Sequence, residues 1–198
     1  KYDSSRWITE PFHLYDCCLE NDGAAAIILV PAERAADFSH RPCYVLGAVA
    51  GSHHRAAAGV HNDAHYATST FETVAPRLYD MAKVTPGDVD VVQSYENFTG
   101  GVMMALVEHG FCTPDQVNDF FTFDNLVTPD GDFPLNTSGG NLAEAYMHGL
   151  GLTIEAIRQI RGTSTNQVRR DGVDVSMMIA GPMVTPVSSC IFGSEASL

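Results

Sequence analysis

Two tyrosines lie where the sequence predicts a binding corner for a carbonyl oxygen. Tyr95 follows the strand-like run Val89 to Gln93, so it lies at the C-terminal end of a predicted parallel strand, the edge where open α/β sheets place ligands. Tyr146 follows a loop with two adjacent glycines, Gly139 and Gly140. Glycines let backbone amides approach a ligand, and the start of the helix expected after them offers unpaired N–H groups. Such a corner suits a thioester oxygen or an enolate.

The phenol group sets the chemistry that these tyrosines can perform. A free phenol has a pKa of about 10, against about 6.5 for imidazole, so roughly one tyrosine in a thousand is ionised at pH 7. An unperturbed tyrosine is therefore a hydrogen-bond donor and an acid before it is a base. The structural alternative for both residues is a core aromatic side chain with a satisfied hydroxyl group.

Ionisable and polar residues flank both tyrosines. Glu96, Glu144 and His148 are predicted to support proton transfer to and from the tyrosines. Two polar residues that open the Gly-rich loop either line the site or cap the following helix. The predicted substrate-binding residues of this loop are Asn136, Ser138, Gly139 and Gly140.

Three segments resemble motifs of the thiolase superfamily. Ser94 to Phe98 resembles its Asn/His-Glu/Asp-x-Phe motif, and Asn136 to Gly149 resembles its Gly-Gly-(five residues)-His-Pro-x-Gly motif. Tyrosine occupies the polar catalytic position of both. Asp16 to Ala26 is similar to the Asp-Cys-Cys…Asp-Gly-Ala-Ala-Ala stretch of sterol-carrier-protein-type thiolases. The resemblance covers nearly the whole chain, and it is greatest to the lipid-transfer-protein-like members that carry both tyrosines.

The resemblance implies an enzyme, a carbon–carbon lyase. Those members are retro-aldolases that act on steroid side-chain acyl-CoA thioesters. The implied reaction cleaves a branched 3-hydroxyacyl-CoA to a ketone and a short acyl-CoA such as propionyl-CoA. One tyrosine would relay the hydroxyl proton and the other would donate to the enolate oxygen or protonate its carbon, with the assignment left open. The CoA thioester is the substrate, and no cofactor or metal is expected.

Two alternatives stay open. One is a thiolase, an acetyl-CoA C-acyltransferase whose nucleophilic cysteine lies in an N-terminal half outside this sequence. The thiolase pattern also expects a cysteine before a Gly-rich closing turn, and Met178 to Pro182 contains none, which argues against thiolysis. The other alternative is a non-catalytic acyl-CoA-binding scaffold.

The implied fold is the layered α/β fold of thiolases. Residues 1–38 would end the N-terminal half, and 39–198 would form the C-terminal half. Helical periodicity predicts helices over 70–83 and 97–109, a short helix over 115–121, and a longest helix from Leu142 through Ile160 that carries Tyr146 on its buried stripe. We expect a mixed, mainly parallel five-stranded sheet in the C-terminal half, plus the last strand of the N-terminal half at 24–30. The strands expected in the C-terminal half include 43–50, 89–93, 173–180 and 187–192.

The resemblance also implies partners. These are a second thiolase-type subunit in a homodimer, and a small acyl-CoA-binding protein with an OB fold and a zinc ribbon. Half a thiolase would expose the apolar face of its 24–30 strand. We therefore expect this chain to belong to a larger assembly.

The charge of the chain excludes one class of partner. The sequence has 11 Lys and Arg against 24 Asp and Glu, a formal net charge of −13. Nucleic acid is disfavoured because no basic stripe could release counterions from phosphate. For the CoA phosphates, Arg6, Arg41 and Arg55 are weak local candidates.

The cysteines favour a reducing cytoplasm. The chain has five cysteines, an odd number, and no Cys-x-x-Cys pair, so neither a disulfide framework nor a zinc site is indicated. Cys17 and Cys18 are interpreted as small core residues. No apolar run of about 18 residues predicts a membrane span.

A histidine-rich segment has residue types that could bind a metal ion. His61 and His65 are four residues apart, but the surrounding sequence predicts no regular helix to align them. A loop at the rim of the pocket is the preferred interpretation, and by the resemblance this loop and Tyr66 border the substrate. The other members of the cluster are His53, His54 and Asp63.

Overall fold

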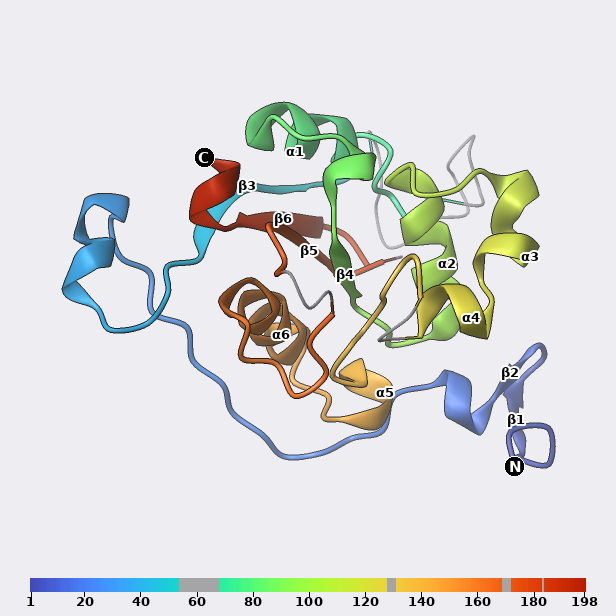
Figure 1. Ribbon diagram of the computed structural model, residues 1–198. Helices are drawn as coiled ribbons and strands as arrows, with labels where there is room; N and C mark the ends of the chain where they lie inside the picture. The colour runs from blue at the N-terminus through green and yellow to red at the C-terminus, as the bar shows by residue number, and fades with distance from the viewer. Residues whose placement is uncertain (54–67, 128–130, 169–171, 183) are drawn as a thin grey trace.

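The computed structural model describes residues 1–53, 68–127, 131–168, 172–182 and 184–198. Its centre is a four-stranded sheet with the strand order β3-β6-β5-β4 (Figure 1). Both β3 and β5 run antiparallel to β6, whereas β4 runs parallel to β5. The strands are β3 (Tyr44–Gly51), β4 (Val91–Ser94), β5 (Val175–Ala180) and β6 (Val187–Gly193). These strands confirm the four predicted from residue 43 onward.

Two expectations about the sheet are wrong within the described residues. The sheet has four strands where five were expected, and two of its three pairings are antiparallel. A single parallel bridge from Val92 to Leu135 stands where a fifth strand would lie beside β4. Pairing ends there because Asn136 has a φ of +48°, a left-handed conformation that turns the chain out of an extended path.

Helices cover both faces of the sheet and produce a layered α/β/α arrangement (Figure 1). On one face lie α1 (Ala75–Ala82) and α2 (Thr99–Glu108), and on the other lies α6 (Leu150–Arg161) against β4 and β5. Successive side chains of a strand point to opposite faces of the sheet, and here apolar side chains lie on both faces. Val92 and Met177 pack on the α1 side, whereas Val91 and Met178 pack on the α6 side. Tyr95 has the parity of Val91 and joins the α6 side.

The predicted longest helix is broken into two. A short α5 (Gly140–Ala143) is followed by a non-helical linker and then by α6. A helix cannot continue through this linker, because His148 and Gly149 have φ values of +50° and +84°. The placement of Tyr146 on a buried helical stripe is therefore wrong. Tyr146 lies in the linker, half-buried.

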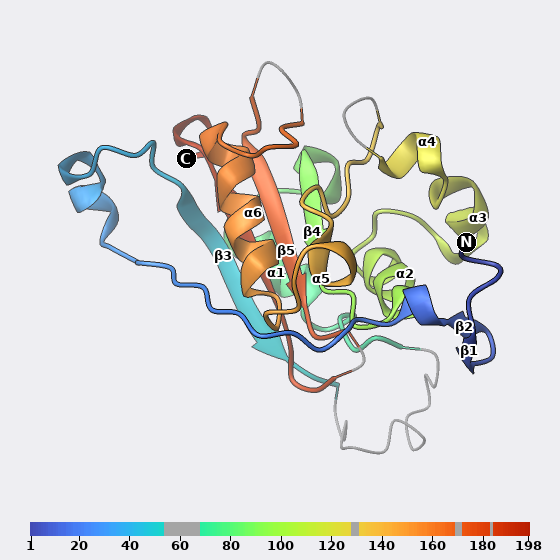
Figure 2. The ribbon, with the colours of Figure 1, turned by 90° about the horizontal axis from the view of Figure 1, so that it is seen from below.

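The N-terminal segment forms little sheet. A small hairpin of β1 (Trp7–Thr9) and β2 (Phe12–His13) lies beside α2. Residues 17–31 then run on the α6 side of the sheet (Figure 2). The strand predicted at 24–30 does not form in the described chain, since this segment has no sheet partner there. Its apolar side chains face outward, with Ile28 84% and Leu29 78% exposed.

The remaining helical elements are short. The helix predicted over 115–121 is confirmed as a 3₁₀ turn followed by α3 (Val117–Phe120), and α4 (Phe123–Leu126) comes next. Within the described ranges, no helix has both the length and the apolar character needed to cross a membrane. The 3₁₀ turn before α3 is Pro114–Gln116, and the others are Leu14–Asp16, Ala32–Asp37, Pro86–Asp88 and Glu195–Ser197.

Candidate active site

The two predicted tyrosines meet through their hydroxyl groups. The hydroxyl oxygens of Tyr95 and Tyr146 lie 2.6 Å apart, and either can donate the hydrogen bond. Their ring centroids are 6.0 Å apart and the rings are tilted by 59°. Tyr95 is only 8% exposed. Burial first, and then the hydrogen bond to Tyr146, raises the pKa of Tyr95 above its usual value. Tyr95 is therefore held as a neutral phenol.

The backbone before Tyr95 is fixed by a side-chain clamp. The Ser94 amide donates to Asn136 Oδ1 at 2.7 Å, and Asn136 Nδ2 donates to the Ser94 carbonyl at 2.9 Å. The Tyr95 amide donates to the Ile179 carbonyl of β5 at 2.8 Å. Asn136 was expected either to contact substrate or to cap a helix. In the structure its side chain hydrogen-bonds to Ser94 at the end of β4.

Tyr146 is held by contacts from a distant segment and from its own linker. The Tyr146 amide donates to Asn21 Oδ1 at 2.6 Å, and the ring of His148 lies 4.7 Å from the Tyr146 ring. A Cβ atom added to Gly149 would lie 2.7 Å from Met178 Cε and 3.0 Å from Tyr95 Cδ2. Only glycine therefore allows the linker to pass this close to β5 and Tyr95.

The Gly-rich loop, which was predicted to bind substrate, packs closely against Glu96. Glu96 is 3% exposed, and a Cβ atom added to Gly140 would collide with Glu96 Oε1. Gly139 and Gly140 have φ values of +98° and +61°, which favour glycine. The Gly140 amide donates to Ser138 Oγ over a long 3.4 Å. The tight turn is thus built around a carboxyl group.

Burial dominates the titration of Glu96. It raises the pKa of this carboxyl to about 7, although hydrogen bonds from nearby backbone amides and from Asn136 oppose the shift. Glu144 and His148, the other two residues predicted to support proton transfer, are exposed. His148 lies in the linker beside Tyr146, and Glu144 directly follows α5.

The N-terminal segment brings residues to the site that sequence reasoning did not assign to it. The Cys18 amide donates to the Asn97 carbonyl at 3.1 Å, and Cys17 forms an isolated bridge with Phe98. Burial raises the pKa of both thiols. Cys18 and Asn21 border the tyrosine pair, but no sequence signal could have found these contacts because they join residues more than 70 positions apart.

A pocket opens beside Tyr146. It has a volume of about 520 Å³ and lies between the N-terminal segment and the linker. Small and apolar residues form much of its wall, and Glu20, Asn21, Tyr146 and His148 contribute polar groups to the lining. The other lining residues are Gly23, Ala24, Ala25, Met147 and Leu150.

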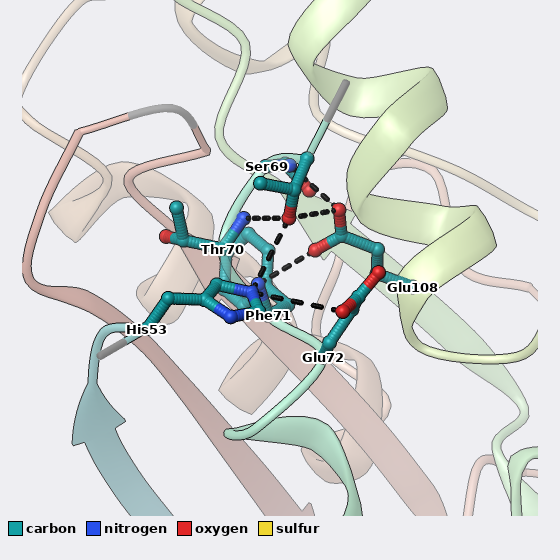
Figure 3. Close-up of polar contacts among 7 residues, drawn as sticks. His53, Ser69, Thr70, Phe71, Glu72 and Glu108 are labelled. Carbon is teal, nitrogen blue, oxygen red and sulfur yellow. Dashed lines mark hydrogen bonds and ion pairs between the residues drawn. The ribbon is translucent and has the colours of Figure 1, made fainter. Parts of the chain in front are cut away.

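A second polar cluster fixes the chain before α1 (Figure 3). The Glu108 carboxylate accepts hydrogen bonds from Thr68 Oγ1 at 2.7 Å and from the amides of Ser69 and Phe71, each at 2.6 Å. His53 Nε2 lies 3.4 Å from Thr68 Oγ1 and 3.9 Å from a Glu72 carboxylate oxygen. The cluster anchors this turn to the end of α2.

Part of the predicted pocket rim lies outside the described residues, namely His54, His61, Asp63, His65, Tyr66 and the weak phosphate candidate Arg55. In the part of the chain that the structure describes, no group of three or more His, Cys, Asp or Glu residues is placed to hold a metal ion.

Comparison with known proteins identifies similar chains. Residues 50–194 match the family described as thiolase C-terminal domain-like. The chain is 36% identical to the steroid side-chain-cleaving aldolase of Thermomonospora curvata, over 98% of this chain and 49% of that protein. It is 37% identical to the 17-hydroxy-3-oxo-4-pregnene-20-carboxyl-CoA lyase of Mycobacterium tuberculosis, over 97% of this chain and 49% of that protein.

A solved structure is also similar. The structure of an Ltp2-ChsH2(DUF35) aldolase superposes with a TM-score of 0.92 at 37% sequence identity, over 100% of this chain and 51% of that chain. The chain spans about half the length of the curated relatives that it matches.

Proposed function

The chain belongs to the thiolase superfamily, and we propose that it acts as an acyl-CoA retro-aldolase. The proposed substrate is a branched 3-hydroxyacyl-CoA, specifically a steroid side-chain thioester, and the products are a ketone and a short acyl-CoA such as propionyl-CoA. The names of two relatives, a steroid side-chain-cleaving aldolase and a pregnene-carboxyl-CoA lyase, support this substrate class.

The observation that carries the proposal is the 2.6 Å contact between the hydroxyl groups of Tyr95 and Tyr146. A retro-aldol cleavage removes the proton of the 3-hydroxyl group, breaks the bond between C2 and C3, and leaves a ketone at C3. The electron pair of that bond passes to C2 and forms a thioester enolate, which must then be protonated at C2. The reaction therefore takes one proton from oxygen and returns one to carbon.

Two phenols in direct contact are suited to these two proton transfers. The proton that leaves the substrate hydroxyl enters the pair, and a proton of the pair goes to C2, so the two tyrosines end as they began. Tyr146 lines the pocket, whereas Tyr95 is buried, so we assign Tyr146 to the substrate hydroxyl and Tyr95 to the position behind it in the pair. A neutral donor beside the developing enolate also stabilises its charge. This chemistry needs no cofactor or metal.

The local chemistry disfavours the thiolase alternative. Met178 to Pro182, where thiolases carry an acid–base cysteine, has no sulfhydryl group.

The pocket beside Tyr146 suits the acyl part of the substrate. Its volume of about 520 Å³ is within the range of small-molecule sites, which are apolar with a few polar groups. Ala24, Ala25 and Leu150 supply apolar wall. We assign the branched acyl chain to this pocket, with Tyr146 at the reacting carbons.

The proposed assembly is a thiolase-type homodimer with a small OB-fold, zinc-ribbon protein that binds the acyl-CoA. The exposed apolar side chains of Ile28 and Leu29 support burial against further protein, and the similar solved structure is named as a two-component aldolase.

All five cysteines lie in the described ranges and are free, which favours a reducing cytoplasm.

The test is an assay of the full-length protein with a branched 3-hydroxyacyl-CoA, with and without added free CoA. We expect ketone and short acyl-CoA in equal amounts, at a rate that free CoA does not increase. A product that forms only with free CoA would support thiolysis instead. Binding of the thioester without any turnover would leave the scaffold alternative.

A further inference from the structure

Glu96 carries a buried carboxyl group whose hydrogen bonding is incomplete. Its Oε1 atom accepts a long hydrogen bond from the Leu142 amide at 3.5 Å. Its Oε2 atom is buried and has no hydrogen-bond partner in the structure. None of the ion pairs within the described ranges involves Glu96.

These surroundings favour the uncharged form of the carboxyl group. An ionised carboxylate buried without a cation or a full set of donors carries a large desolvation cost. The pKa of Glu96, raised to about 7 chiefly by burial, agrees with this geometric argument. Below that pH the native site therefore holds a neutral acid.

The carboxyl group joins the two elements that carry the tyrosines. Glu96 directly follows Tyr95 at the end of β4, and its Oε1 atom lies against Gly140, the first residue of α5. The helix α5 ends at Ala143, and Tyr146 follows three residues later. Displacement of this contact would therefore move Tyr146 relative to Tyr95.

The groups that face the carboxyl come from three elements. Tyr95 and Cys18 are the titratable groups, and the charge of Glu96 raises the pKa of each. The uncharged donors are the backbone amides of Glu96 itself, Leu142 and Asn141, and the side chain of Asn136. A negative charge on Glu96 would thus meet no cation, and it would oppose the negative charge that develops on an enolate beside the tyrosine pair.

We propose that Glu96 is a positioning residue for the tyrosine pair, whose uncharged carboxyl group holds α5 against the end of β4. Ionisation leaves Oε2 needing donors that its neighbours do not supply, so the carboxylate reorients and loosens the contact with Gly140. Both this loosening and the added negative charge slow the cleavage step. The assignment rests on the proposed retro-aldol function, and it differs from a proton relay because Oε2 is closed off from solvent.

The test measures kcat and KM for a branched 3-hydroxyacyl-CoA between about pH 5 and pH 9. The full-length protein is compared with Glu96→Gln, Glu96→Ala and the control Glu33→Gln, an exposed carboxylate on a remote 3₁₀ turn. We expect the kcat of the unaltered protein to fall as the pH rises through about 7, with little change in KM. In Glu96→Gln kcat should no longer fall with pH, whereas in Glu33→Gln it should fall as in the unaltered protein. Glu96→Ala should lower kcat by about 10²-fold, because the tyrosine pair is then misplaced.

Several results would overturn the assignment. One is a Glu96→Gln variant with the same pH dependence as the unaltered protein, and another is a Glu96→Ala variant with unchanged kcat. If the Glu96 variants do not fold, Gly140→Ala probes the same contact from the other side. Its reference is Gly162→Ala, which has a φ of +70° and no atom within 4 Å of the added Cβ. Equal kcat values for these two glycine variants would overturn it.

Failure of the proposed function can be told apart from failure of this inference. If no 3-hydroxyacyl-CoA is cleaved, the function fails, and the state of Glu96 is read from stability instead. The free energy of unfolding of the unaltered protein should fall relative to Glu96→Gln as the pH rises to about 7. A constant difference between the two proteins would reject the uncharged carboxyl group itself.

Discussion

The Tyr95 and Tyr146 hydroxyl groups are joined by a 2.6 Å hydrogen bond, although 50 residues separate them in the chain. Tyr95 directly follows strand β4, and Tyr146 lies in the linker between α5 and α6. In the proposed mechanism the two hydroxyl groups act together, so removal of either one should impair the other.

Tyr95→Phe and Tyr146→Phe should each lower the rate of ketone release by about 10² to 10³-fold. Phenylalanine keeps the packing of the ring and deletes only the hydroxyl, so binding of the CoA ester should change little. The matched control is Tyr79→Phe, since the Tyr79 hydroxyl donates to the His109 carbonyl at 2.8 Å, outside the site. Steady-state kinetics would count against the pair if all three variants behaved alike.

The stability of the protein should depend on pH through Glu96. The native pKa of about 7 lies above the ordinary value of 4.5, so the native state binds the proton more tightly than the unfolded state. The contribution is fully present below about pH 4.5 and is lost as the pH rises through 7, at a cost of roughly 3 kcal/mol. Denaturant unfolding of the unaltered protein and Glu96→Gln across this range measures it. An identical pH dependence in both would contradict the shift.

Glu108→Gln should destabilise the fold by about 2 kcal/mol. The Glu108 carboxylate accepts three hydrogen bonds from residues 68–71, and an amide group has only one acceptor oxygen for them. The control is Glu72→Gln, because the Glu72 side chain is 46% exposed and its contact with His53 spans 3.9 Å. Thermal unfolding should show a change below about 0.5 kcal/mol for this control. Equal losses for the two variants would refute the anchoring role of Glu108.

Gly149→Ala should reduce both stability and cleavage, because the added methyl group meets Met178 and the Tyr95 ring. Overpacking of this kind typically costs about 1 to 3 kcal/mol. Gly162→Ala isolates the backbone contribution, since Gly162 also has a positive φ but its added Cβ meets no neighbour within 4 Å. Calorimetry and the cleavage assay should separate the two variants. Indistinguishable results would mean that the close approach at Gly149 is unimportant.

The sequence determined most of the local elements and predicted the residues of the candidate site. Runs rich in apolar residues predicted the four strands from residue 43 onward, because strands that pack against other layers carry mostly apolar side chains. The family motifs identified Tyr95 and Tyr146, and the spatial contact between them is what the tertiary structure adds. The boundary at residues 38 and 39 stays a prediction.

Only the tertiary structure decided the direction of the strands and the path of the chain through the site. The strand β6 runs antiparallel to both β3 and β5, so the sheet is mainly antiparallel. Apolar runs cannot reveal this because they carry no direction. Helical periodicity continued through 144–149, but close packing of Gly149 against Met178 and Tyr95 accompanies a left-handed break. Likewise, only the tertiary structure shows that Gly140 lies against Glu96. Periodicity and motifs record local preference, whereas these outcomes depend on contacts between residues that are distant in the chain.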